Sequence, residues 1–168
     1  MEEYENNWEN SFESIGYPNW LWKTVKEKLL YESPSDVQIS CGEIWNLVKA
    51  GKYEHILAQS KSGTGKTLAF LSIVISFLEK LTGLTNSVSE VEWHKPKVLI
   101  LAPTREIAIQ INDFAQLIMS DFPDKNISLL SSPIIGGLKI SETKANILID
   151  KPIIVCGTLG RLIGKFWA

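Results

Sequence analysis

Cysteine, histidine and long apolar runs are scarce in this sequence of 168 residues. The two cysteines, Cys41 and Cys156, have no neighbours at the spacing of metal ligands, and neither His55 nor His94 has a nearby partner residue. This scarcity argues against a disulfide framework or a metal cluster, and it is typical of a reducing compartment. The longest apolar run, residues 68–78, is too short to span a bilayer.

An excess of charge of one sign is also missing. The formal net charge is −2, from 17 Lys and Arg against 19 Asp and Glu. Such a chain has no global attraction to a polyanion, so any nucleic-acid site must be local. The N-terminus is acidic and lacks the positive-then-apolar order of a signal peptide. We therefore expect a soluble, intracellular protein of the nucleus, the cytoplasm or both.

The hydrophobic pattern alternates between helix and strand periods, and the hydrophobic share of 45% is typical of a globular chain. Helical spacing predicts helices over residues 19–30, 42–50, 66–81, 105–119 and 141–150. Short apolar runs predict strands over residues 55–59, 98–101, 127–130 and 153–155. The run 98–101 is apolar without alternation, which indicates burial on both faces. The order predicts an α/β fold, a parallel sheet with helices on both faces.

A glycine-rich loop lies between a predicted strand and a long predicted helix. Residues 60–67 read Ser-Lys-Ser-Gly-Thr-Gly-Lys-Thr, with Ser60 where the phosphate-loop pattern has glycine. Glycines let backbone N–H groups turn toward phosphate oxygens, and the helix start adds its positive dipole end. The lysine would reach the outer phosphates and Thr67 would ligate Mg²⁺. The alternative is an ordinary helix start. The expected ATP-binding residues of the loop are Ser62, Gly63, Thr64, Gly65, Lys66 and Thr67.

Three later motifs resemble those of DEAD-box RNA helicases. Residues 103–108, Pro-Thr-Arg-Glu-Ile-Ala, are similar to the family's Pro-Thr-Arg-Glu-Leu-Ala motif. Gly136-Gly137 resembles its glycine pair, and residues 158–162, Thr-Leu-Gly-Arg-Leu, resemble its Thr-Pro-Gly-Arg-Leu motif. The resemblance implies the first RecA-like P-loop NTPase domain of an ATP-dependent RNA helicase. Within the family, residues 58–67 are most similar to the branch associated with the survival-of-motor-neuron complex, which implies partners in ribonucleoprotein assembly.

Upstream of the loop, residues 31–38 resemble the family's Q motif, with Leu30 standing where glycine is usual. Gln38 matches the motif's glutamine, and Phe12 matches the isolated aromatic that precedes it. The resemblance implies that Gln38 reads the edge of adenine and that Phe12 stacks on its ring. From the residues alone, a surface polar role for Gln38 and a core-anchor role for Phe12 stay open.

The same resemblance places an RNA track at the ends of the predicted strands. Thr104 can cap the helix that follows it, whose free N–H groups then hold a phosphate, and Arg105 adds a charge-assisted contact. A row of backbone N–H groups with few cationic side chains would bind single-stranded RNA through its sugar-phosphate chain, without reading the bases. A solvated Arg105 and a plain tight turn at Gly136-Gly137 are the alternatives. The expected RNA-binding residues are Pro103, Thr104, Arg105, Gly136, Gly137, Thr158, Gly160 and Arg161.

The sequence contains neither an Asp-Glu-Ala-Asp string nor a Ser-Ala-Thr string. Phosphoryl transfer needs a Mg²⁺-binding acid, a water-positioning residue and an arginine finger, which the resemblance places in the missing string and in a second RecA-like domain. We therefore assign no catalytic residue and expect weak ATP binding with almost no hydrolysis. Residues 1–11 would be an acidic tail and 12–168 a partial ATP-binding domain with a sheet incomplete at its C-terminal end.

Two other readings of the chain stay open. One is a non-catalytic P-loop domain that binds RNA or a helicase partner. The other is a different P-loop enzyme, such as a small-molecule kinase, and the motifs at 103–108 and 158–162 argue against it.

Overall fold

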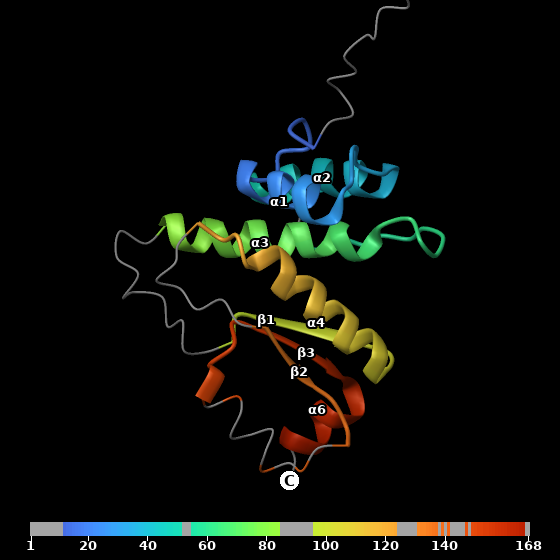
Figure 1. Ribbon diagram of the computed structural model, residues 1–168, viewed down its shortest axis with the longest axis vertical. Helices are drawn as coiled ribbons and strands as arrows, with labels where there is room; N and C mark the ends of the chain where they lie inside the picture. Colours follow the sequence, from blue (N-terminus) through green and yellow to red (C-terminus); the bar gives the residue numbers. More distant parts are fainter. Residues whose placement is uncertain are drawn as a thin grey trace, which may run out of the picture. The chain divides into compact units, whose positions relative to one another are not determined.

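The computed structural model describes residues 12–51, 55–84, 96–123, 131–137, 139, 141, 147 and 149–166. The chain divides into two compact units, Met1–Leu81 and Thr82–Ala168, and each is described by itself. Figure 1 shows helices only in the first unit and a sheet with helices in the second. Among the described helices, none has the length and apolar character needed to cross a bilayer.

The first unit contains helices α1 (Asn19–Leu29), α2 (Asp36–Lys49) and most of α3 (Lys66–Leu84). The predicted helices at 19–30 and 66–81 are confirmed, and α3 extends slightly further. A tryptophan of α1 ties it to α3, because Trp20 Nε1 donates a hydrogen bond to Glu79 Oε1 at 2.9 Å. The core of the unit is apolar and drawn from all three helices and the turn before α1: Phe12, Ile15, Leu21, Val25, Trp45, Leu71, Ile75 and Leu78.

Helix α2 begins at Asp36, earlier than the predicted start at residue 42. The first turn is closed by Gln38, whose Oε1 accepts a hydrogen bond from the backbone N–H of Ser35 at 3.0 Å. This is one half of the reciprocal capping that Ser-x-x-Gln sequences favour. Gly42 lies inside the helix, where a Cβ atom would be 2.8 Å from the carbonyl oxygen of Ile15. The glycine therefore marks a close contact with the preceding turn rather than a helix start.

The predicted strand at 55–59 is wrong, because residues 55–60 adopt no regular secondary structure. Leu57, in the middle of this segment, is 95% exposed. A strand forms only where a neighbour completes its backbone hydrogen bonds, and the described part of the first unit contains no other strand. An apolar run alone cannot supply that neighbour.

The second unit is built on a three-stranded parallel sheet in the order β1-β3-β2. The strands are β1 (Val98–Ala102), β2 (Ser131–Ile134) and β3 (Ile154–Thr158). Helix α4 (Arg105–Met119) contacts all three strands, and α6 (Leu159–Phe166) contacts β3 (Figure 1). The parallel arrangement and the helix predicted at 105–119 are confirmed.

The two faces of this sheet are covered unequally. Helix α4 lies over the face that carries Ser131, whose Oγ donates to the carbonyl oxygen of Asn112. On the opposite face, Leu162 of α6 packs with Ile134 and Val155. That cover does not extend over β1, where Leu99 and Leu101 are each 56% exposed. The prediction that residues 98–101 are buried on both faces is therefore wrong for β1, whereas central β3 is buried from Ile154 to Gly157.

Other predicted elements differ in their bounds or lie outside the described residues. β3 ends at Thr158 rather than at residue 155, so Thr158 is the last strand residue and not part of the following turn. The predicted strand at 127–130 lies outside the described residues, and the observed strand begins at Ser131. Most of the helix predicted at 141–150 and the whole of the tail 1–11 also lie outside them.

Candidate functional site

The phosphate-binding pattern forms a tight loop that ends where α3 begins at Lys66. Gly63 and Gly65 have φ values of 78° and 91°, in the left-handed region that favours glycine. The ammonium group of Lys66 donates to the carbonyl oxygen of Ser60 at 2.8 Å and to that of Lys61. The cation is thus held against the loop, where an incoming anion would meet it.

The start of α3 is also electrically suited to an anion. Its first turn contains no acidic side chain, so no carboxylate of that turn offsets the positive end of the helix dipole. The hydroxyls of Ser60 and Thr64 lie 2.6 Å apart, and Thr64 Oγ1 donates to the carbonyl oxygen of Lys61. These contacts fix the turn that presents the backbone N–H groups.

The Q-motif segment is hydrogen-bonded to this loop. Gln38 is 4% exposed, and its Nε2 donates to the carbonyl oxygen of Gly65 at 3.3 Å. Ser35 Oγ donates to the carbonyl oxygen of Thr64 at 2.8 Å. A Cβ atom on Gly65 would lie 2.5 Å from Gln38 Nε2. Gln38 is therefore buried against the loop, so the surface-polar alternative does not describe it.

Ser35 was not predicted as a functional residue. The capping pattern Ser35-x-x-Gln38 predicts a helix start, but it does not predict the hydrogen bond from Ser35 Oγ to the phosphate loop.

A pocket of about 430 Å³ opens between the end of α1 and the start of α2 and is lined by Lys26, Leu30, Tyr31 and Glu32. Tyr31 offers an exposed aromatic ring there. Phe12, in contrast, is buried in the core, which leaves little of its ring for a ligand. Its stacking role stays a prediction, and Tyr31 is an aromatic that the motif comparison passed over.

In the second unit the predicted RNA residues follow the carboxyl ends of the strands. Ala102 pairs with Thr158, and Ile134 pairs with Gly157, so the three strands end at one edge of the sheet. Parallel α/β sheets bind ligands at this edge. Thr104 caps α4, its Oγ1 accepting from the N–H of Ile107 at 3.3 Å, as predicted.

The structure brings Arg105 onto the glycine pair. A Cβ atom on Gly136 would lie 2.7 Å from Arg105 Nη2, and one on Gly137 would lie 3.5 Å from Nη1. Gly137 has a φ of 103°, a further reason for glycine. Arg105 is exposed, yet its guanidinium lies against the backbone of Gly136 and Gly137, where a larger side chain would push it away.

The remaining RNA candidates lie in and beside the first turn of α6. Gly160 is exposed, with open space where a Cβ would be, and Arg161 is half-buried. No acidic side chain occupies that first turn. In α4, by contrast, Glu106 lies in the first turn, and hydrogen bonds from its own backbone N–H and from Thr104, with Arg105 nearby, lower its pKa.

A sequence profile of the DEAD/DEAH box helicase family matches residues 41–167. The chain belongs to this family. This DEAD-box chain is 35% identical over 150 residues to the pre-mRNA-splicing ATP-dependent RNA helicase PRP28 of Debaryomyces hansenii, covering 87% of the chain and 24% of that protein. It is 31% identical to the ATP-dependent RNA helicase DeaD of Buchnera aphidicola, covering 92% of the chain and 22% of that protein.

Solved DEAD-box structures share the fold of this chain. The yeast splicing factor Prp28 superposes with a TM-score of 0.73 at 26% identity, over 94% of this chain and 34% of that one. Mss116 bound to single-stranded RNA and UDP-BeF superposes with a TM-score of 0.74 at 22% identity, over 92% and 29%. The predicted RecA-like fold and family are confirmed. The DEAD-box chain spans about a quarter of the length of its curated relatives.

Proposed function

We propose that this DEAD-box chain binds ATP through its first unit and single-stranded RNA through its second, as the first half of a helicase core over residues 12–168. The observation that carries the proposal is the bonding of the Q-motif residues Ser35 and Gln38 to the phosphate loop. Its relatives are named ATP-dependent RNA helicases, and Mss116 has been solved with single-stranded RNA and nucleotide analogues.

The triphosphate would lie on residues 62–67 and replace the loop carbonyls as the partner of Lys66. Thr67 would be the protein ligand of Mg²⁺, the ion that screens the phosphate charge. The described residues hold no cluster of carboxylates for a metal, and a single hydroxyl suits Mg²⁺, which is commonly bound through phosphates and waters. The adenine would lie in the pocket beside Tyr31. Gln38 and Phe12 do not line that pocket, so the roles that the family resemblance implies for them stay predictions.

RNA would cross the edge where the three strands end. The capped start of α4, the glycine pair and the first turn of α6 each offer backbone N–H groups to a phosphate. Arg105, held over Gly136 and Gly137, would add one charge-assisted contact. Contacts of this kind recognise the sugar-phosphate chain rather than the bases, which agrees with a net charge of −2.

We assign no residue of this chain to hydrolysis, because the sequence has no Asp-Glu-Ala-Asp string. Unwinding is therefore proposed only for a protein of the relatives' length. The survival-of-motor-neuron branch, with partners in ribonucleoprotein assembly, stays a prediction from residues 58–67.

Titration of the chain with a fluorescent ATP analogue and Mg²⁺ tests the nucleotide site. Lys66→Ala should abolish binding, whereas Lys80→Ala removes the same charge from an exposed position near the other end of α3 and should not change it. A fluorescent single-stranded RNA tests the second unit, where Arg105→Ala should weaken binding and Arg105→Lys should restore only part of it. RNA binding without any ATP binding would favour the non-catalytic alternative.

A further inference from the structure

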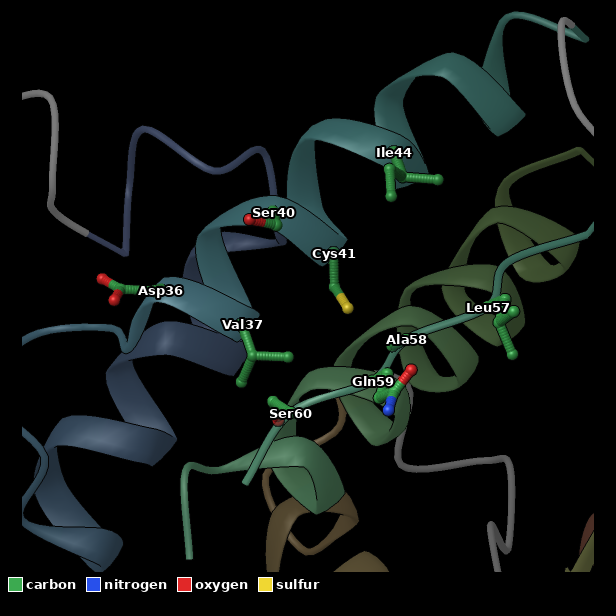
Figure 2. A pocket seen from close by; sticks show the side chains of 9 residues that line it. All are labelled: Asp36, Val37, Ser40, Cys41, Ile44, Leu57, Ala58, Gln59 and Ser60. Carbon is green, nitrogen blue, oxygen red and sulfur yellow. The ribbon is translucent and has the colours of Figure 1, made fainter. Parts of the chain in front are cut away.

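A second pocket in the first unit, of about 320 Å³, lies between α2 and the segment that leads into the phosphate loop (Figure 2). Its lining comes from one face of α2 and from four consecutive residues of that segment: Asp36, Val37, Ser40, Cys41, Ile44, Leu57, Ala58, Gln59 and Ser60. It is separate from the pocket beside Tyr31, since the two share no lining residue.

The pocket combines apolar walls with one nucleophile. Val37, Ile44 and Leu57 supply aliphatic surface, and Asp36 is the charged side chain of the lining. Cys41 is 4% exposed, and Figure 2 shows its Sγ directed toward the 57–59 segment. Among the described residues, no hydrogen bond includes this thiol, and the buried phenol of Tyr17 is close enough to interact with it electrostatically.

The pocket also shares a wall with the phosphate loop. Ser60 lines it, and the same residue contacts Thr64 through its hydroxyl and accepts from Lys66 through its carbonyl oxygen. Across the pocket, α2 carries Gln38, which holds Gly65. A molecule that moved Ser60 would therefore disturb the loop directly.

We propose that this pocket is a covalent ligand site, in which Cys41 captures a small uncharged α,β-unsaturated carbonyl compound. The apolar walls favour an uncharged body, and Asp36 disfavours an anion. The Cys41 thiolate adds to the β-carbon and forms an S–C bond, while the π electrons of the double bond pass to the α-carbon. That carbon takes up a proton equivalent to the one the thiol released, so no oxidant is needed and no group leaves.

The chain contains its own reference thiol. Cys156 is fully buried in β3, and burial raises its pKa to about 12. Burial also raises the pKa of Cys41, so its labelling should be slow at neutral pH and should quicken about tenfold per pH unit while the thiol is mostly protonated. The two cysteines differ in that the pocket opens onto Cys41 and does not open onto Cys156.

The test is timed labelling of the whole chain with N-ethylmaleimide at pH 8, followed by peptide mass mapping. Cys41 should be alkylated at least about tenfold faster than Cys156, which reacts only when the structure opens. Ser40→Trp, at an exposed position on the rim, should slow Cys41 labelling several-fold without touching the thiol, and urea should abolish both differences. Equal rates for the two cysteines, labelling of Cys41 only in urea, or no effect of Ser40→Trp would each overturn the proposal.

A second measurement tests whether this pocket affects the phosphate loop. That link rests on the proposed nucleotide function, whereas the pocket itself does not. The alkylated chain should bind the fluorescent ATP analogue several-fold more weakly, whereas Cys41→Ser treated in the same way should not change. Selective labelling with unchanged ATP binding would keep the pocket and reject its link to the loop. If the untreated chain never binds ATP, the proposed function fails and the labelling result still decides the pocket.

Discussion

Leu30 offers a direct test of backbone strain at the end of α1. Its φ and ψ are 57° and 31°, in the left-handed region, and its side chain is 79% exposed. A residue with a Cβ atom is destabilised there by about 1–2 kcal/mol. Glycine avoids that strain but loses about 0.5–1 kcal/mol more backbone entropy on folding. In the Q motif that residues 31–38 resemble, glycine is expected at this position, so we expect the leucine to carry a cost in stability.

The cleanest comparison is between Leu30→Gly and Leu30→Ala, because both variants lose the same few side-chain contacts. Glycine should be the more stable of the two by roughly 0.5–1 kcal/mol, the difference between strain and entropy. For a chain of this length, that difference raises the midpoint of thermal unfolding by about 1–4 °C. Circular dichroism during thermal and urea unfolding measures both quantities.

A matched pair inside α1 provides the control. At Glu27, exposed and in regular helix, alanine should be more stable than glycine by about 1 kcal/mol, the reverse of the order at position 30. If alanine equals or exceeds glycine at position 30, the left-handed conformation of Leu30 does not strain the chain, and the reasoning fails.

Three further predictions concern the two candidate sites. Gly65→Ala would place a Cβ 2.5 Å from Gln38 Nε2 at a φ of 91°, so it should destabilise the loop by about 1–3 kcal/mol and abolish binding of the ATP analogue. Gly136→Ala would place a Cβ 2.7 Å from Arg105 Nη2, so the guanidinium should shift and RNA binding should weaken, though less than in Arg105→Ala because the charge remains, as fluorescence anisotropy would show. Glu106 has a lowered pKa in the folded state, so its contribution to stability is present above the unfolded pKa and should be lost as the pH falls through the folded pKa.

Each of these predictions has a control. Gly63→Ala meets no atom within 4 Å and strains only the backbone, so it should be milder than Gly65→Ala. If the two glycine variants behave alike, the contact with Gln38 does not matter. RNA affinity that survives Gly136→Ala but not Arg105→Ala would mean that the guanidinium binds RNA from another position. The stability of Glu106→Gln should fall less between neutral and acid pH than that of the parent chain, by the share that Glu106 contributes.

Local signals predicted the helices well. The helix at 105–119 was predicted with its observed bounds, because its cap at Thr104 and its apolar face are both encoded within a few neighbouring residues. The start of α2 was missed although its signal was equally local. Val37, Cys41 and Ile44 already recur at helical spacing, but Gly42 was taken as the helix start and the capping pair Ser35 and Gln38 was read solely as a family motif.

Strand pairing and the burial of each sheet face were harder to predict, since they depend on residues distant in the sequence. Whether residues 55–59 form a strand depends on a neighbouring strand, and whether Leu99 is buried depends on what lies over β1. The same applies to the sites. Motifs identified Gln38 and Arg105, but only the fold shows that they contact Gly65 and Gly136.

The bonds of Lys66 to the carbonyl oxygens of Ser60 and Lys61 bear on selectivity. Any anion that recruits this ammonium group must displace two good acceptors, so the affinity it gains is a difference between two sets of hydrogen bonds. A compact anion would gain little from that exchange, whereas a chain of phosphates could also bind the backbone N–H groups along the loop. We therefore expect the loop to bind a chain of phosphates more tightly than sulfate or inorganic phosphate, independently of any contact with a nucleotide base.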